Sequence, residues 1–286
     1  MSALYANPVP FKFFAELIDQ LSKCTARPKL DNPLRDQPSK QIRLVQRWID
    51  QVKRVHGQEM GNPLPPGTVI IFFRLLFPEE GVRRRYGLQE YTFAKELEKH
   101  YRVAEGTFAD WCRTSDDDVA AATGSLGETV KRWLERKGKC LAGDSALTLG
   151  RIDELLDELA STSTYSARDV QALRAQPHFR IRPLDQILFD LLHPLDASQT
   201  ALMIQLILRD LSPILYPAPS ESVSVSLNQY TSTCYDRIDL VRVMHAWDPR
   251  MARIHRTVAD LDWVAATVED WIRKSLPALN PALSTL

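Results

Sequence analysis

Cationic side chains recur at helical spacing in the segment 39–57. Lys40, Arg43, Arg47 and Arg54 follow one another at intervals of three, four and seven residues, so on a helix they share one face. The apolar side chains of the segment take the opposite face: Ile42, Val45, Trp48, Ile49 and Val52. A row of cations at this pitch can contact successive phosphates of a DNA duplex. The alternative is an ordinary solvated helix face, although only Asp50 interrupts the row.

A second candidate phosphate site is the glycine-containing turn that precedes the basic segment 128–137. Gly124 and Gly127 stand in this turn, and such a turn can leave the first backbone N–H groups of the helix free for an anion. The helix adds cations at Lys131, Arg132, Arg136, Lys137 and Lys139. Ordinary turn chemistry is the alternative, and Glu128 would compete with a phosphate.

The sequence contains no recognisable catalytic or metal-binding constellation. Its six histidines lack metal-ligand spacing, and the nucleophile-elbow, P-loop and dinucleotide-binding glycine patterns are absent. The carboxylate pairs at 153–154 and 157–158 fall on the polar face of an amphipathic segment, so we interpret them as solubilising. The run Arg83 to Arg85 follows Glu79 and Glu80, and we interpret it as a solvated turn.

Composition indicates a folded protein that does not bind nucleic acid by bulk charge. Hydrophobic residues make up 44% and charged residues 25% of 286 residues, and the formal net charge is zero. DNA binding therefore requires the cations to be sorted onto one surface. The four cysteines are scattered, which argues against a disulfide framework or a zinc site and favours a reducing compartment. With no secretory signal and no long apolar run, we expect a soluble intracellular protein without membrane contact.

The elements that must position these cations are helices. Proline at position 10 suits a first helical residue, and Phe11, Phe14, Leu17, Ile18 and Leu21 then form one apolar stripe. Ser39 and Thr148 suit the N-caps of two later helices. Segment 69–77 is apolar all round, which fits a buried helix or a strand, and its neighbours favour a helix. Segment 220–230 alternates like a strand but also fits a capped helix, which we prefer. Further helices are expected at 88–101, 128–137, 149–160, 183–192, 198–211, 236–247 and 258–276, with a turn at 161–166 that leads into another helix. The fold class predicted is all-α.

Several segments, taken in order, are similar to ATP-dependent DNA ligases. The stretch 71–78 (IFFRLLFP) followed by 83–90 (RRRYGLQE) resembles a ligase IV segment in which a buried helix ends in proline. Segment 147–160 (LTLGRIDELLDELA) resembles a ligase helix, and 124–128 resembles the family's Gly-x-x-Gly-Asp turn. Segment 206–212 (LILRDLS) resembles the end of another family helix, which contacts DNA and includes Arg209. The similarity spans about residues 9–250 and is closest to a eukaryotic, fungal ligase of the ligase IV type.

The resemblance implies a large all-helical DNA-binding domain with internal pseudo-symmetry over residues 1–286. Its core would occupy about 9–250, and a C-terminal helix at 257–276 would lead toward an adenylation domain beyond the chain. Such a domain grips double-stranded or nicked DNA during non-homologous end joining in the nucleus. In ligase IV the first helices also dock the nuclease Artemis, which assigns a partner-binding role to Phe11, Trp48, Val52 and Val55.

The chain departs from the family at two places and lacks the family's catalytic motif. Segment 212–217 replaces a basic residue and glycine that usually contact DNA, and Glu128 stands where the family prefers aspartate. Ligases form a lysyl-adenylate at Lys-x-Asp-Gly. The nearest string here, at Lys29, lacks the glycine. We therefore expect no cofactor in this chain, with ATP and Mg²⁺ belonging to other domains, and no activity from the chain alone.

The sequence thus predicts sequence-independent DNA binding through Lys40, Arg43, Arg47, Gly124, Gly127, Lys131, Arg132 and Arg209. The alternative function is a helical docking adaptor that retains the ligase fold without useful DNA affinity. The zero net charge and the altered segment 212–217 support that alternative.

Overall fold

The computed structural model describes residues 3–24, 39–56, 64–108, 125–139, 147–175, 182–216 and 237–274. Within these ranges the chain is helical, and the only β-type pairing is an isolated bridge between Pro10 and Thr148. The predicted all-α class is confirmed. None of the described helices is both long enough and apolar enough to cross a membrane. Segment 220–230, for which a helix was preferred, lies outside the described residues.

The first half of the chain forms its helices where caps and apolar stripes predicted them. The side chain of Ser39 accepts a hydrogen bond from the N–H of Ile42 (3.3 Å), and that of Thr148 accepts from Arg151 (3.2 Å). Pro10 is the N-cap of the first helix and not its first residue. The apolar segment near 69–77 is a helix, as preferred. The elements are η1 (Ala3–Ala6), α1 (Phe11–Ser22), α2 (Lys40–His56), α3 (Thr68–Leu76), α4 (Glu90–Tyr101), α5 (Leu126–Arg136) and α6 (Leu149–Ser161).

The second half contains more and shorter helices than the sequence predicted. Asp196 and Gln199 form a capping box, so α9 begins at Ala197, one residue before the predicted start. The helix ends at Leu208, before the predicted end at 211. A short helix that was not predicted, α12, precedes the last helix, α13. The side chain of Asp260 caps the start of α13 by accepting a hydrogen bond from the N–H of Trp263 (3.1 Å). The elements are α7 (Arg168–Ala172), η3 (Leu173–Ala175), α8 (Leu184–Leu192), α9 (Ala197–Leu208), α10 (Ser212–Leu215), α11 (Leu240–Trp247), α12 (Met251–Thr257) and α13 (Leu261–Lys274).

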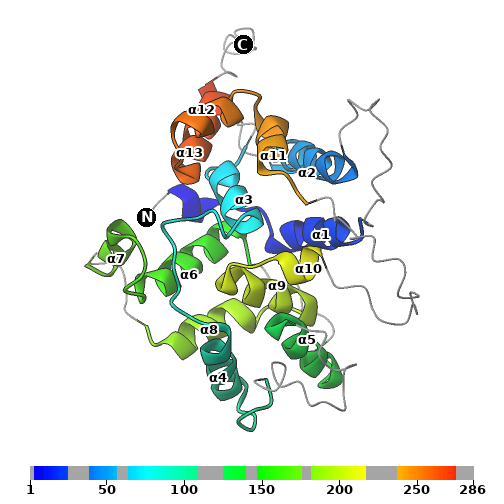
Figure 1. The fold of residues 1–286 in the computed structure, drawn as a ribbon, viewed down its shortest axis with the longest axis vertical. Helices are drawn as coiled ribbons and strands as arrows, with labels where there is room; N and C mark the ends of the chain where they lie inside the picture. The colour runs from blue at the N-terminus through cyan, green and yellow to red at the C-terminus, as the bar shows by residue number, and fades with distance from the viewer. Residues whose placement is uncertain are drawn as a thin grey trace, which may run out of the picture.

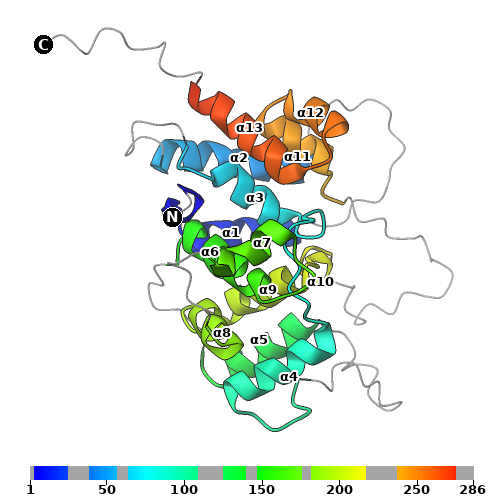
Figure 2. The ribbon, with the colours of Figure 1, turned by 90° about the vertical axis from the view of Figure 1, so that its left-hand side faces the viewer.

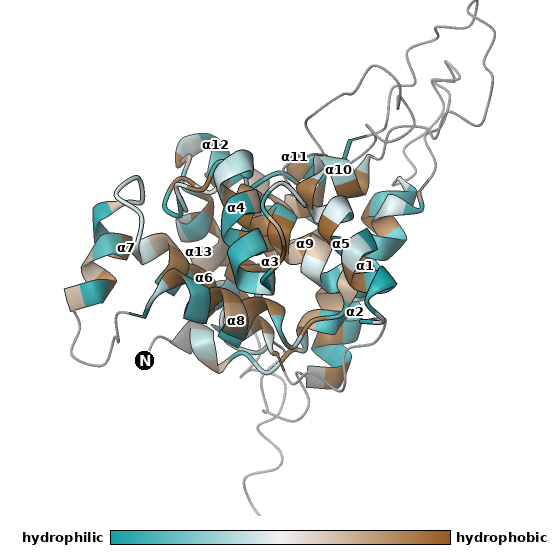
Figure 3. Cartoon of the chain, turned by 90° about the horizontal axis from the view of Figure 1, so that it is seen from below, coloured by the Kyte–Doolittle hydropathy of each residue, from teal (hydrophilic) through white to brown (hydrophobic). Residues whose placement is uncertain are grey.

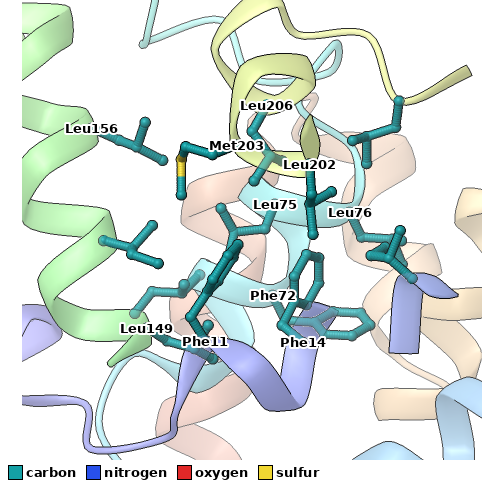
Figure 4. Close-up of a cluster of buried hydrophobic side chains, with 14 of the residues drawn as sticks. Phe11, Phe14, Phe72, Leu75, Leu76, Leu149, Leu156, Leu202, Met203 and Leu206 are labelled. Carbon is teal, nitrogen blue, oxygen red and sulfur yellow. The ribbon is translucent and has the colours of Figure 1, made fainter. Parts of the chain in front are cut away.

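The helices stack along one long axis (Figures 1 and 2). Helices α2, α11, α12 and α13 form one end, and α4, α5 and α8 form the other. Helix α9 lies between them and is buried on almost every side, because α1, α5 and α8 all pack on it. The core where α1, α3, α6 and α9 meet includes Phe14, Phe72, Leu156 and Met203 (Figure 4). One continuous core therefore fixes the helices that carry the cationic segments.

Helix α13 is part of this body and packs along α3. Its buried Glu269 accepts hydrogen bonds from the backbone N–H groups of Gly67 (2.5 Å) and Val69 (3.0 Å). The carboxylate thereby occupies the N-terminus of α3, where the helix dipole favours negative charge. The C-terminal helix is thus held by the fold through both apolar packing and a buried polar contact.

A buried ion-pair network replaces the solvated surface expected at Arg84 and at the α6 acids Asp153 and Asp157, whereas Arg85 is exposed as predicted. Arg84 contacts Asp153 and Asp157 at 2.7 Å each, and Arg74 contacts Asp153 (2.9 Å) and Asp262 (2.8 Å). The side chain of Asp153 is fully buried. The interpretation of these acids as solubilising is therefore wrong, because arginines from α3 and from the loop after it cover the acidic face of α6.

Burial by itself would raise the pKa values of Asp157 and Asp262. The neighbouring guanidinium groups outweigh it: Arg84 holds the pKa of Asp157 below its usual value, and Arg74 does the same for Asp262. Asp157 and Asp262 therefore stay ionised, and the network ties α3, α6, α13 and the loop after α3 together.

Candidate nucleic-acid interface

Helix α2 presents its cations directly opposite its buried face. Ile42, Val45, Trp48, Ile49 and Val52 are buried, whereas Lys40, Arg43, Arg47 and Arg54 are exposed. Within the described part of the chain none of these four cations forms an ion pair. Their charge is therefore available to an external anion, and a continuous helix fixes its spacing.

The core anchors α2 firmly. The indole Nε1 of Trp48 donates to the carbonyl oxygen of Phe13 (3.0 Å), and the Trp48 ring lies 4.9 Å from the ring of Phe72. Trp247 of α11 contacts both rings edge-on. These contacts give the cationic face of α2 a fixed orientation.

Helix α5 carries the second predicted set of cations, but its own Glu128 partly neutralises the first two. Glu128 pairs with Arg132 (3.2 Å) and with Lys131 (3.6 Å). Farther along the helix, Arg136 and Lys137 are exposed and form no ion pair with any described residue. The unneutralised charge of α5 therefore lies nearer its C-terminal end than the sequence indicated.

The N-terminus of α5 is closed to a phosphate. The N–H of Leu126 donates to Glu90 (3.4 Å), and that of Glu128 donates to the Ser125 side chain (3.3 Å). With its amide oxygen turned toward α5, Gln205 accepts from the N–H of Gly127 (3.3 Å). The free phosphate cradle expected here is not present at Gly127, and Gly124 lies outside the described residues.

Gly127 is required for helix packing. A Cβ atom there would lie 2.8 Å from the carbonyl oxygen of Ala201, so only glycine lets α5 approach α9 this closely. The glycine at position 127, which suggested a phosphate-binding turn, instead allows the backbones of α5 and α9 to come into contact.

Arg209 is bound to the fold. It ends α9 with a left-handed backbone (φ 62°), and its guanidinium donates to the carbonyl oxygens of Pro78 (2.9 Å) and Glu79 (2.9 Å) and to that of Gly81. Burial lowers the pKa of Arg209 from its ordinary value. Arg209 holds the loop after α3 in place, and its DNA contact stays a prediction.

The predicted docking surface for a nuclease is not a surface in this structure. Phe11, Trp48 and Val52 are at most 5% exposed and belong to the core. Only Val55 is accessible, at 43%. The apolar side chains that suggested docking are those through which α1 packs against α2 and α3. The predicted partner-binding role of Phe11, Trp48 and Val52 is therefore replaced by a role in the core.

Two cations that the sequence did not single out are also exposed. Arg253 and Arg256 of α12 form no ion pair with described residues. Their spacing of three residues was the available signal, but the helix itself was not predicted.

Helices α1, α2, α5 and α10 lie along the same side of the molecule (Figures 1 and 3). The exposed α1 residue Lys12 lies on the rim of a groove that separates α1 from α5. Helices α2 and α5, which carry the predicted cations, thus lie on the same side of the molecule, and the groove lies between α1 and α5. No group of metal-binding side chains occurs in the described residues.

A family model described as the DNA ligase N terminus matches residues 10–213. The match covers most of the described helices, from α1 to the start of α10. No curated protein sequence matches the chain.

Proposed function

Because the chain belongs to the DNA ligase N-terminal domain family, we propose that it binds duplex DNA, intact or nicked, without reading its sequence. The observation that carries the proposal is the α2 face, where four cations stand exposed and without ion pairs in the described residues. Phosphate contacts of this kind give affinity and position but no base specificity.

In this proposal the free cations are the main phosphate contacts of the duplex. It would contact Lys40, Arg43 and Arg47 on α2 and reach Arg136 and Lys137 on α5. Lys131 and Arg132 contribute less, because Glu128 offsets part of their charge. Rigid helices favour this binding because little conformational entropy is lost when the phosphates are contacted.

The finer assignment is a eukaryotic, fungal ligase of the ligase IV type that joins double-strand breaks by non-homologous end joining in the nucleus. The residues resembling that type, at 71–90 and 147–160, support it. The lysyl-adenylate, ATP and Mg²⁺ would belong to other domains. An Artemis-like nuclease would have to bind outside the buried Phe11, Trp48 and Val52, with Val55 as its one accessible contact among the four.

A docking adaptor is the second candidate. The zero net charge favours it, and so does segment 212–216, where α10 packs against α1 in place of the family's basic residue and glycine.

DNA binding by the whole chain separates the two functions. The probes are intact and nicked duplexes of equal length at about 50 and 200 mM salt, where phosphate-driven binding should weaken steeply. We expect Arg43→Glu with Arg47→Glu to weaken binding to both duplexes. Gln46→Glu with Gln51→Glu, on the same helix, is the matched control for added negative charge. No binding at about 50 mM salt would reject DNA binding in favour of the adaptor.

A further inference from the structure

A groove of about 1330 Å³ runs between α1 and α5. Residues of α9 and α10 form its floor, and the start of α4 closes part of its edge. Sites for small molecules occupy about 300–1,000 Å³, so the groove is larger than a typical cofactor pocket. Its volume and its position between two helices suit a peptide segment.

The groove is acidic although the chain as a whole is neutral. Six carboxylates line it, against three cations, Lys12, Lys131 and Arg132. Two of the three cations are already paired with Glu128. The carboxylates are Glu16, Asp19, Glu90, Glu128, Asp196 and Asp210. The excess of negative charge repels a DNA backbone, so the groove has the opposite preference to the α2 surface.

Three of these carboxylates are fixed by neutral donors. Glu90 accepts from the N–H of Leu126, Asp196 from that of Gln199 (2.7 Å), and Asp210 from that of Ser212 (2.8 Å). These bonds hold the acids in place without supplying a counter-cation. Glu16 on α1 is exposed and forms no ion pair with the described residues, whereas Asp19 on the same helix pairs with Lys23 (2.6 Å). The rim is therefore pre-organised for positive charge.

The floor supplies an apolar contact. Ala201, Leu202 and Leu208 of α9 and Ile214 of α10 line it. An apolar floor between acidic walls is complementary to a helix that has one apolar face and flanking lysines or arginines. A free metal ion or a polyamine would leave this floor uncovered.

We propose that the groove docks a cationic amphipathic peptide segment of a protein partner. The apolar face of the segment lies on α9 and α10, and its cations face the acids that have no ion pair among the described residues, Glu16 on α1 and Glu90 at the start of α4. This inference does not depend on DNA binding.

The test uses the whole chain and a labelled 14-residue helical peptide with leucine on one face and lysine elsewhere. We expect a dissociation constant below about 100 µM at low salt. Two changes to the peptide test its chemistry, namely glutamate in place of lysine and serine in place of leucine, and both should abolish binding. On the protein, Glu16→Lys with Asp19→Lys should weaken binding about tenfold.

Asp50→Lys, an exposed acid on α2 outside the groove, is the control and should leave peptide binding unchanged. Thermal unfolding of each variant verifies folding, and the altered peptides test the same charges on the unchanged protein. No binding up to about 100 µM overturns the proposal. So does equal binding of the glutamate peptide, or equal loss with Asp50→Lys.

Discussion

The Nε atom of Arg84 donates to Oδ1 of Asp157 across 2.7 Å, and this contact joins the loop after α3 to α6. Seventy-three residues separate the two in sequence. The same guanidinium also reaches the fully buried Asp153. An arginine that the sequence placed on a solvated turn is thereby a structural residue of the core.

Removing the carboxylate of Asp157 should destabilise the fold. Asp157→Asn leaves the buried Arg84 with one counter-charge fewer, and we expect a loss of about 3 kcal/mol in the free energy of unfolding. Urea denaturation measures it. Glu154→Gln, on the same helix but less buried, is the matched control. Equal denaturation midpoints for the two variants would contradict a structural role for the network.

Stability should fall in acid because of the same network. The pKa values of Asp157 and Asp262 are lowered in the folded state, so their contribution is present above the unfolded pKa of about 3.9 and is lost as the pH falls through the folded values. Glu269 acts in the opposite direction, because burial raises its pKa. We expect unfolding free energy, measured from pH 7 to pH 3, to decline below about pH 4. Asp262→Asn should flatten that decline, and an unchanged slope would argue against the assignment.

The two halves of α5 should differ in their effect on DNA binding. Arg136→Glu with Lys137→Glu removes free cations, and each lost phosphate contact should lower the log–log salt slope by about one unit. Lys131→Glu with Arg132→Glu should have a smaller effect, since Glu128 already offsets part of that charge. Fluorescence anisotropy at several salt concentrations measures both slopes. A larger effect at 131–132 would place the duplex at the helix start instead.

The chain alone should not form a covalent adenylate. It contains no Lys-x-Asp-Gly, and the string at Lys29 lies outside the described residues. Incubation with α-labelled ATP followed by a denaturing gel gives the readout. A labelled band that disappears in Lys29→Ala would make that lysine the nucleophile.

Trp48 and Val55 should respond differently to truncation. Trp48→Ala removes the ring at the junction of α2, α3 and α11, and we expect about 3–5 kcal/mol of destabilisation. Val55→Ser, at an exposed position of the same helix, should change stability by less than about 0.5 kcal/mol. Chemical denaturation compares them. If Trp48→Ala unfolds at the same denaturant concentration as the wild type, Trp48 is not needed for the core and a partner-binding role becomes the better explanation.

The sequence by itself determined most of the longer helices and the apolar face that each of them buries. Ser39 and Thr148 cap α2 and α6 where predicted, and the apolar stripe of α2 is buried along its described length. These features depend on residues within a few turns of one another, because a cap acts over three residues and a stripe repeats every turn. The resemblance in segments 71–90 and 147–160 likewise pointed to the family that the match over 10–213 supports.

Only the tertiary structure decided what covers each polar face. The acids of α6 stand opposite its apolar stripe as predicted, but arginines from α3 and the loop after it bury them. Gly127 faces the backbone of α9, and Arg209 binds the carbonyl groups of the loop after α3. Helical periodicity reports the direction of a side chain relative to its own helix. Whether water, a phosphate or a distant arginine meets that side chain depends on contacts between residues far apart in the chain, which local spacing does not encode.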